Sequence, residues 1–197
     1  MITSTIRRDV LTDVRSYFEN APDIAKKAAV MALNQAIVRK GLKGIKSKIN
    51  QEINFPRGYL DTPGRLSVIK ATKGKLEARV RARARPTSLA RFGTQVGNKV
   101  LVKVSKSGQS KVLPRAFMIN LSSGNRGLAI RLPAGENPKS AYKPTRIVSG
   151  SNSRTDLWLL YGPSVYQIMN NVVDEVTPEV EAYVKAEFMR QFIRLST

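Results

Sequence analysis

The chain has 197 residues, of which 34 are Lys or Arg and 14 are Asp or Glu, so its formal charge is +20. It contains neither Cys nor His, which excludes disulfides, thiolate and imidazole metal sites, Cys nucleophiles and Ser-His-Asp triads. No stretch of about 20 apolar residues is present, so we expect no membrane-spanning helix, and the absence of Cys favours a protein made in a reducing compartment.

Most of the excess positive charge lies in the middle of the chain. Residues 1–61 carry 11 basic and 6 acidic side chains, residues 62–155 carry 20 and 2, and residues 156–197 carry 3 and 6. A compact region with so few carboxylates repels itself, which destabilises it unless an anionic partner neutralises the charge. We therefore expect the middle region to face nucleic acid or an acidic protein surface. A basic protein that is merely kept soluble by its charge is the alternative.

We expect residues 1–21 to form an N-terminal extension, with a short helix over 3–19. Apolar residues recurring at three- and four-residue steps then predict a long helix over 22–53, with a kink or break near Gly41 and Gly44. Short strands are expected within 66–71, 76–84, 100–104, 116–121, 128–132 and 157–161. Segments rich in Gly, Pro, Ser or other polar residues predict long loops at 86–98, 105–114 and 133–156.

The apolar pattern is again helical from Ser164 to Arg194. Thr177, Pro178 and Glu179 have the order of an N-cap, N1 and N2, so we expect two helices, or one kinked helix, restarting at Thr177. The order helix, strands, helix predicts an α+β fold, in which an antiparallel or mixed sheet packs against a long N-terminal helix and a kinked C-terminal helix. We expect residues 22–197 to form a single domain.

Four arginines alternate with small apolar residues from Ala78 to Arg85. In a strand, side chains alternate between the two faces, so the arginines would point one way at a spacing of about 6.6 Å. Each guanidinium offers a planar fork to an anionic oxygen, which favours a surface that faces a polyanion. The alternative is the solvent face of an edge strand, where charge discourages aggregation. The row consists of Arg79, Arg81, Arg83 and Arg85.

Lys99 and Lys103 extend the basic region. Phe92 and Phe117 are the only aromatic residues between positions 62 and 130, so the stacking platforms of single-strand binders are missing. No helix-turn-helix, zinc-finger or RNP signature is visible. If nucleic acid is the partner, we therefore expect contacts to its backbone without sequence readout.

The sequence offers little material for catalysis. Asp174, Glu175, Glu179 and Glu181 lie on the polar side of the predicted C-terminal helix, where a solvated face is expected rather than an acid/base pair. No Walker-type or dinucleotide-binding glycine loop is present. We therefore predict a protein that is not an enzyme and that uses no cofactor or metal.

The order of several short motifs resembles the minor tail protein Z family of tailed bacteriophages, also called tail completion proteins. The resemblance covers roughly residues 22–195. It begins in the first long helix, passes through the arginine-rich strand, and ends at a turn that leads into the terminal helix. The motifs are Ala28-Ala29-Val30-Met31-Ala32-Leu33-Asn34-Gln35-Ala36, Arg65-Leu66, Lys70-Ala71-Thr72, Pro114-Arg115-Ala116-Phe117-Met118-Ile119 and Leu160-Tyr161-Gly162-Pro163-Ser164-Val165.

The resemblance implies a virion structural protein at the head–tail junction, assembled in the host cytoplasm, which helps to complete the tail and join it to the head around the DNA channel. It implies a homo-oligomeric ring, with a hexamer favoured, in contact with tail-terminator, tail-tube or connector proteins and with DNA in the lumen. A ring needs head-to-tail interfaces. Glu179 and Glu181 are candidates to meet the basic middle of a neighbouring copy.

Trp158 and Tyr161 are further interface candidates. The alternative, which the turn residues Gly162, Pro163 and Ser164 favour, is a strand-to-helix turn without a partner role. A sequence-independent nucleic-acid-binding protein that is not part of a virion remains the alternative function. Such a module should stay monomeric or dimeric and lose affinity steeply as the salt concentration rises.

Overall fold

A computed structural model describes residues 23–140, 142–147 and 155–197. It contains two long helical segments and antiparallel sheets, which confirms the predicted α+β class. The domain expected over residues 22–197 contains two compact units. The described parts of the first, which we call the helical unit, are residues 23–49, 60–84 and 166–197; the second, the strand unit, comprises residues 50–59 and 85–165. The helix predicted over 3–19 lies outside the described residues.

The predicted N-terminal helix is present as one helical run in three parts. The α-helix α2 (Asp23–Ala36) passes into a π-helical turn, η1 (Ile37–Leu42), and then into α3 (Lys43–Glu52). The expected kink or break is therefore a π turn that contains Gly41, and the backbone is helical on both sides of it. The buried face of α2 is a stripe of small residues, namely Ala25, Ala28, Ala29, Ala32 and Ala36.

Gly44 allows α3 to pack closely against the C-terminal helix. A Cβ atom at this position would lie 2.7 Å from Cγ1 of Val176, which is shorter than any ordinary carbon–carbon contact. The valine is β-branched and rotates little, so it cannot easily move away. Glycine has a low helix propensity, but at this position it permits the close approach of the two helices.

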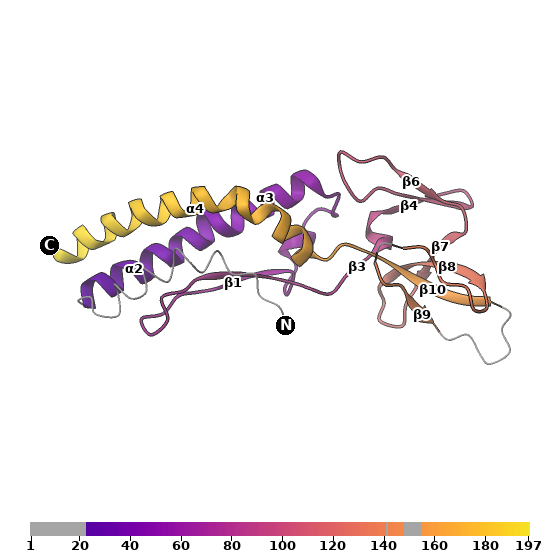
Figure 1. Cartoon of the computed structure of the whole chain (residues 1–197), viewed down its shortest axis with the longest axis horizontal. Coiled ribbons are helices and arrows are strands. Elements are labelled where there is room, and N and C mark those ends of the chain that lie inside the picture. The colour runs from indigo at the N-terminus through magenta and orange to yellow at the C-terminus, as the bar shows by residue number, and fades with distance from the viewer. Residues whose placement is uncertain (1–22, 141, 148–154) are drawn as a thin grey trace. The chain divides into compact units, whose positions relative to one another are not determined.

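The C-terminal helix, α4 (Val165–Ser196), is continuous through Pro178 and bends along its length (Figure 1). Of the two expected alternatives, the single helix is the one observed. The Thr177 hydroxyl donates a hydrogen bond to the Val173 carbonyl at 2.8 Å, so Thr177 bonds back within the helix and does not cap a new one. Val172, Val176 and Val180 are buried on both sides of the proline, and this packing compensates for the hydrogen bond that proline cannot make.

Strands β1 (Leu66–Ile69) and β2 (Arg79–Ala82) form an antiparallel hairpin in the helical unit. Both were predicted, with longer ranges. The Asn34 side chain links α2 to this hairpin, because its amide group donates to the Ala71 carbonyl at 3.0 Å and its oxygen accepts the Ala71 N–H at 2.7 Å. Figure 1 shows α2 and α4 running side by side in this unit.

The strand unit contains two antiparallel sheets. One has the order β4-β5-β6, and the other has the order β3-β10-β8-β7, with β9 also paired to β10. Aromatic residues lie in the core, where the rings of Phe55 and Tyr59 stack at 4.6 Å. The strands are β3 (Thr87–Ser88), β4 (Gly93–Val96), β5 (Lys99–Val102), β6 (Lys111–Leu113), β7 (Ala116–Asn120), β8 (Arg126–Pro133), β9 (Thr145–Ile147) and β10 (Thr155–Gly162); η2 (Tyr59–Asp61) and η3 (Leu89–Phe92) are 3-10 turns.

The three segments predicted as loops contain regular structure, which corrects that prediction. Strands β3 and β4 with the turn η3 lie in 86–98, β6 lies in 105–114, and β9 lies in 133–156, of which 141 and 148–154 are outside the described residues. These strands have two to four residues and lack a clear apolar alternation. Cross-strand pairing rather than local pattern stabilises such segments.

We predict that Gly44→Leu destabilises the protein by about 1–3 kcal/mol, the usual cost of overpacking a well-packed site, because the new side chain meets Val176. Ser47→Leu is the matched control, since it places the same side chain at an exposed position of α3. Thermal unfolding followed by circular dichroism measures both. Equal melting temperatures for the two variants would contradict the close contact.

Candidate cationic and partner-contact surface

The cations of the strands have almost no acidic neighbours in sequence. Residues 78–135 contain 12 Lys or Arg and no Asp or Glu, and strands β2 to β8 all lie in this range. The strand unit as a whole carries 14 basic and 3 acidic side chains, a net charge of +11. Its positive charge therefore has few carboxylates of its own to pair with.

The predicted row of four arginines does not lie on one strand. Within β2 the alternation is as expected, because Val80 and Ala82 are buried and Arg79 and Arg81 lie on the opposite face. Strand β2 ends at Ala82, and the Arg83 N–H continues the pairing one residue further by donating to the Arg65 carbonyl at 2.9 Å. Arg85 belongs to the strand unit. Arg79 and Arg81 thus share a face of β2, Arg83 follows directly at its end, and Arg85 is separated from them.

Arg79 already has an internal partner. Its guanidinium binds both carboxylate oxygens of Glu77, and this hydrogen bonding holds the pKa of Glu77 below its ordinary value and raises the pKa of Arg79. Arg81 is exposed. Of the two arginines on β2, Arg81 is therefore the one more available to an external anion.

Lys99 and Lys103 lie on the same side of the middle strand of the three-stranded sheet. Lys99 begins β5, and the Lys103 N–H continues the ladder beyond its end by donating to the Phe92 carbonyl at 3.0 Å. Residues 99, 101 and 103 therefore share one face, since side chains alternate along an extended backbone. Lys99 and Lys103 are therefore two predicted cations that lie on one face of the same sheet.

The aromatic interface candidates are part of β10. Trp158 is half-buried opposite Ile130, and Tyr161 is half-buried opposite Ser88. A buried carboxylate lies close to Trp158 in sequence: Asp156 is 5% exposed and accepts a hydrogen bond at 2.6 Å from the guanidinium of Arg146, whose side chain is exposed. This hydrogen bond lowers the pKa of Asp156. The partner role of the two aromatic residues stays a prediction.

Glu179, a predicted contact to a neighbouring copy, is paired within its own chain. Its carboxylate accepts a hydrogen bond from the Lys40 ammonium at 2.7 Å, and Glu175 similarly accepts one from Lys48 at 2.6 Å. These two ion pairs connect α4 to η1 and α3. Glu181 is half-buried on α4.

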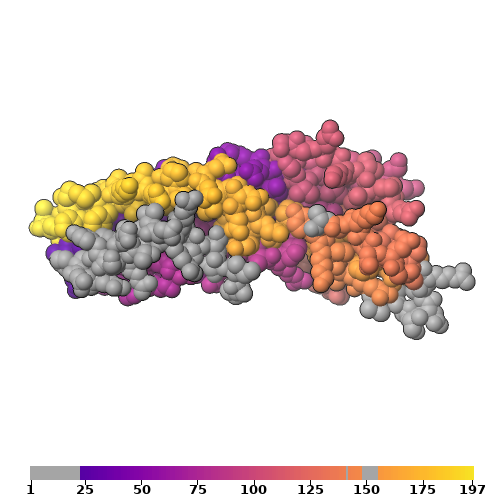
Figure 2. Space-filling view, in the orientation of Figure 1, coloured from indigo at the N-terminus to yellow at the C-terminus, as the bar shows by residue number. Residues whose placement is uncertain are grey.

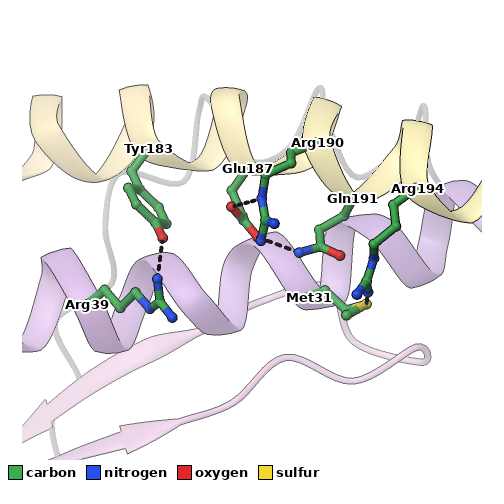
Figure 3. Close-up of polar contacts among 7 residues, drawn as sticks. All are labelled: Met31, Arg39, Tyr183, Glu187, Arg190, Gln191 and Arg194. Carbon is green, nitrogen blue, oxygen red and sulfur yellow. Dashed lines mark hydrogen bonds and ion pairs between the residues drawn. The ribbon is translucent and has the colours of Figure 1, made fainter.

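A polar cluster on the buried side of α4 was missed by the sequence analysis (Figure 3). Glu187 accepts two hydrogen bonds from Arg190, at 2.9 and 2.6 Å, and one from the amide of the buried Gln191. The hydrogen bonds from Arg190 contribute most to lowering the pKa of Glu187 to about 2. A Glu and a Gln four residues apart, inside the apolar stripe that includes Phe188 and Phe192, could have revealed this cluster.

The described residues contain no cluster of acidic side chains able to hold a metal ion. A small cavity in the helical unit has apolar walls, which include Ile37, Gly41, Val80 and Val176. Among the described helices, none is long and apolar enough to cross a membrane. Exposed cations and exposed apolar side chains are the surface features of the described residues that a partner could contact.

No protein-family model, curated protein or solved structure matches this chain. The resemblance to tail completion proteins therefore stays an expectation from the order of its motifs.

We predict that Glu187→Gln lowers the free energy of unfolding by about 2 kcal/mol at neutral pH, because it removes charge-assisted hydrogen bonds from a buried site. The folded-state pKa of about 2 lies below the ordinary value of 4.5. The contribution of Glu187 is therefore complete above about pH 4.5 and is lost as the pH falls toward 2.

Urea unfolding of both proteins at several pH values between 2 and 7 measures this difference. Glu181→Gln, on the same helix, is the control and should change stability less. A difference between wild type and Glu187→Gln that stayed constant down to pH 2 would contradict the assigned hydrogen bonds.

Proposed function

We propose that this chain is a non-enzymatic structural protein of a bacteriophage virion, which completes the tail and joins it to the head around the DNA channel. The order of its motifs supports this proposal. The protein would act at the head–tail junction of the particle, after assembly in the host cytoplasm.

The observation that carries the proposal is the shortage of carboxylates around the basic strands. Six of the described acidic side chains are already ion-paired within the chain, namely Asp61, Glu77, Asp156, Glu175, Glu179 and Glu187. The excess of cations therefore calls for an external anion. A ring of several copies would gather this charge around a passage, where DNA phosphates or an acidic protein ring would neutralise it.

Exposed apolar side chains support contact with other proteins. Met189 and Ile193 are exposed on α4, on the side of the helix opposite the buried residues Glu187 and Gln191. In the space-filling view, the yellow atoms of α4 are visible along one side of the helical unit (Figure 2). These two side chains are available for contact with another subunit.

The test is the imaging of particles made with and without this gene product, together with the oligomeric state of the purified full chain. We expect rings from the purified chain, and separate heads and tails when it is missing. Three results together would overturn the proposal in favour of a nucleic-acid-binding module. The purified protein would be monomeric, its deletion would leave particles intact, and its affinity for DNA would fall steeply as the salt concentration rises.

We predict that Arg81→Ala weakens the binding of duplex DNA more than Arg79→Ala, because Glu77 already occupies the guanidinium of Arg79. Loss of one phosphate contact should reduce the slope of log affinity against log salt by about 1. Fluorescence anisotropy with a duplex of about 20 bp measures the slope of log affinity against log salt for each variant.

Glu77→Gln provides the control for this comparison. It frees Arg79, so Arg79→Ala should have a larger effect in the Glu77→Gln background than in the wild type. Equal slopes for Arg79→Ala and Arg81→Ala in the wild-type background would refute the difference between the two arginines.

A further inference from the structure

The outer face of the three-stranded sheet carries an apolar centre between two lysines. The antiparallel register places Leu101 of β5 opposite Val112 of β6 and Thr94 of β4, and places Lys99 opposite Val96. Residues opposite one another in such a sheet share a face. We call this surface the lysine–valine face; it consists of Thr94, Val96, Lys99, Leu101, Lys103 and Val112.

The opposite face of the same sheet belongs to the core. Val100 is 0% exposed and Val102 is 5% exposed, so the alternation of β5 leaves Lys99, Leu101 and Lys103 on the outside. On that outer face Val96 is 59% exposed and Val112 is 52% exposed. The solvated face of an antiparallel sheet is normally polar, and an exposed apolar group rimmed by polar residues marks an interaction site.

Charge decides which partner fits this face. No Asp or Glu occurs between residues 78 and 135, so strands β4 to β6 supply no carboxylate to Lys99 or Lys103. A second copy docked through the same face would bring lysines against lysines in a unit of net charge +11, which is unfavourable. The described carboxylates outside ion pairs, such as Glu52 and Glu136, also lie singly along the chain and offer no acidic cluster.

Nucleic acid would satisfy only part of this surface. Its phosphates would pair with the lysines, but its charged and hydrated backbone would leave Val96, Leu101 and Val112 without an apolar partner. The face also carries no aromatic ring on which a base could stack. A protein surface that combines apolar side chains with carboxylates satisfies both kinds of residue, because interfaces typically have an apolar centre and a polar rim.

We infer that the lysine–valine face docks an acidic protein surface with an apolar centre, and that it is not the part of the chain that contacts DNA. This inference rests on the proposed function only in that both require a partner of opposite charge. It assigns the protein contact to β4–β6 and leaves Arg81, on β2, for polyanion contacts.

The experiment uses the absence of Cys from the chain, which allows a single dye to be attached to the full-length protein. Asn98→Cys, at the exposed turn between β4 and β5, reports on the lysine–valine face, and Lys139→Cys reports on a different exposed position of the strand unit. Three probes are compared: a blocked peptide of alternating Val and Glu, polyglutamate, and duplex DNA.

We expect the Val–Glu peptide to change the fluorescence at position 98 but not at position 139, and to bind more tightly than polyglutamate. Two double variants should each weaken binding of the Val–Glu peptide at least tenfold: Lys99→Glu with Lys103→Glu, and Val96→Ser with Val112→Ser. All four positions are at the surface or half-buried, and circular dichroism verifies that the variants fold. Lys139→Glu is the control and should leave the affinity unchanged.

Several outcomes would overturn the inference. Two concern the peptide: it binds no more tightly than polyglutamate, or it produces no fluorescence change at position 98. A third is a response to DNA that the lysine variant abolishes and the valine variant does not. A fourth is a concentration-dependent fluorescence change without any probe, which would indicate that a second copy binds this face. The particle imaging described above tests the proposed function independently, so the failure of one proposal is distinguishable from the failure of the other.

Discussion

Carboxylates are the scarce component of this protein, and their placement governs both its internal contacts and its surface. With 34 basic and 14 acidic side chains, the chain has too few carboxylates to give each cation one of its own. Several of the ion pairs connect separate elements: Lys40 with Glu179 and Lys48 with Glu175 connect the first helical run to α4, and Arg146 with Asp156 connects β9 to β10.

Exposed ion pairs contribute little individually, so packing must supply most of the stability of the helical unit. Small residues make this packing possible. The alanines of α2 present a flat surface, and Gly44 allows α3 to approach Val176. The buried Glu187 differs from the exposed pairs, because its hydrogen bonds from Arg190 and Gln191 satisfy a charge that burial would otherwise make costly.

The two units present different surface chemistry, and this difference supports the division of roles that we propose. The helical unit carries most of the internal ion pairs and the arginines of β2. The strand unit has the higher excess of cations and a sheet face that combines lysines with exposed valines. The proposed component would need to contact both DNA and other virion proteins, and this chain carries exposed cations and exposed apolar side chains on different strands.

The sequence by itself determined the features that depend on local pattern or on counting. These include the charge distribution, the helical run before residue 53, the helix after residue 164, the alternating strand β2 and the strand β10, which contains a short apolar run. Only the tertiary structure decided that Arg85 is separated from the other arginines, that α4 continues through Pro178, and that β4 and β6 pair with β5. The physical reason is that cross-strand register and burial depend on residues far apart in the chain, so Val96, Lys99 and Val112 become neighbours only when the sheet has formed.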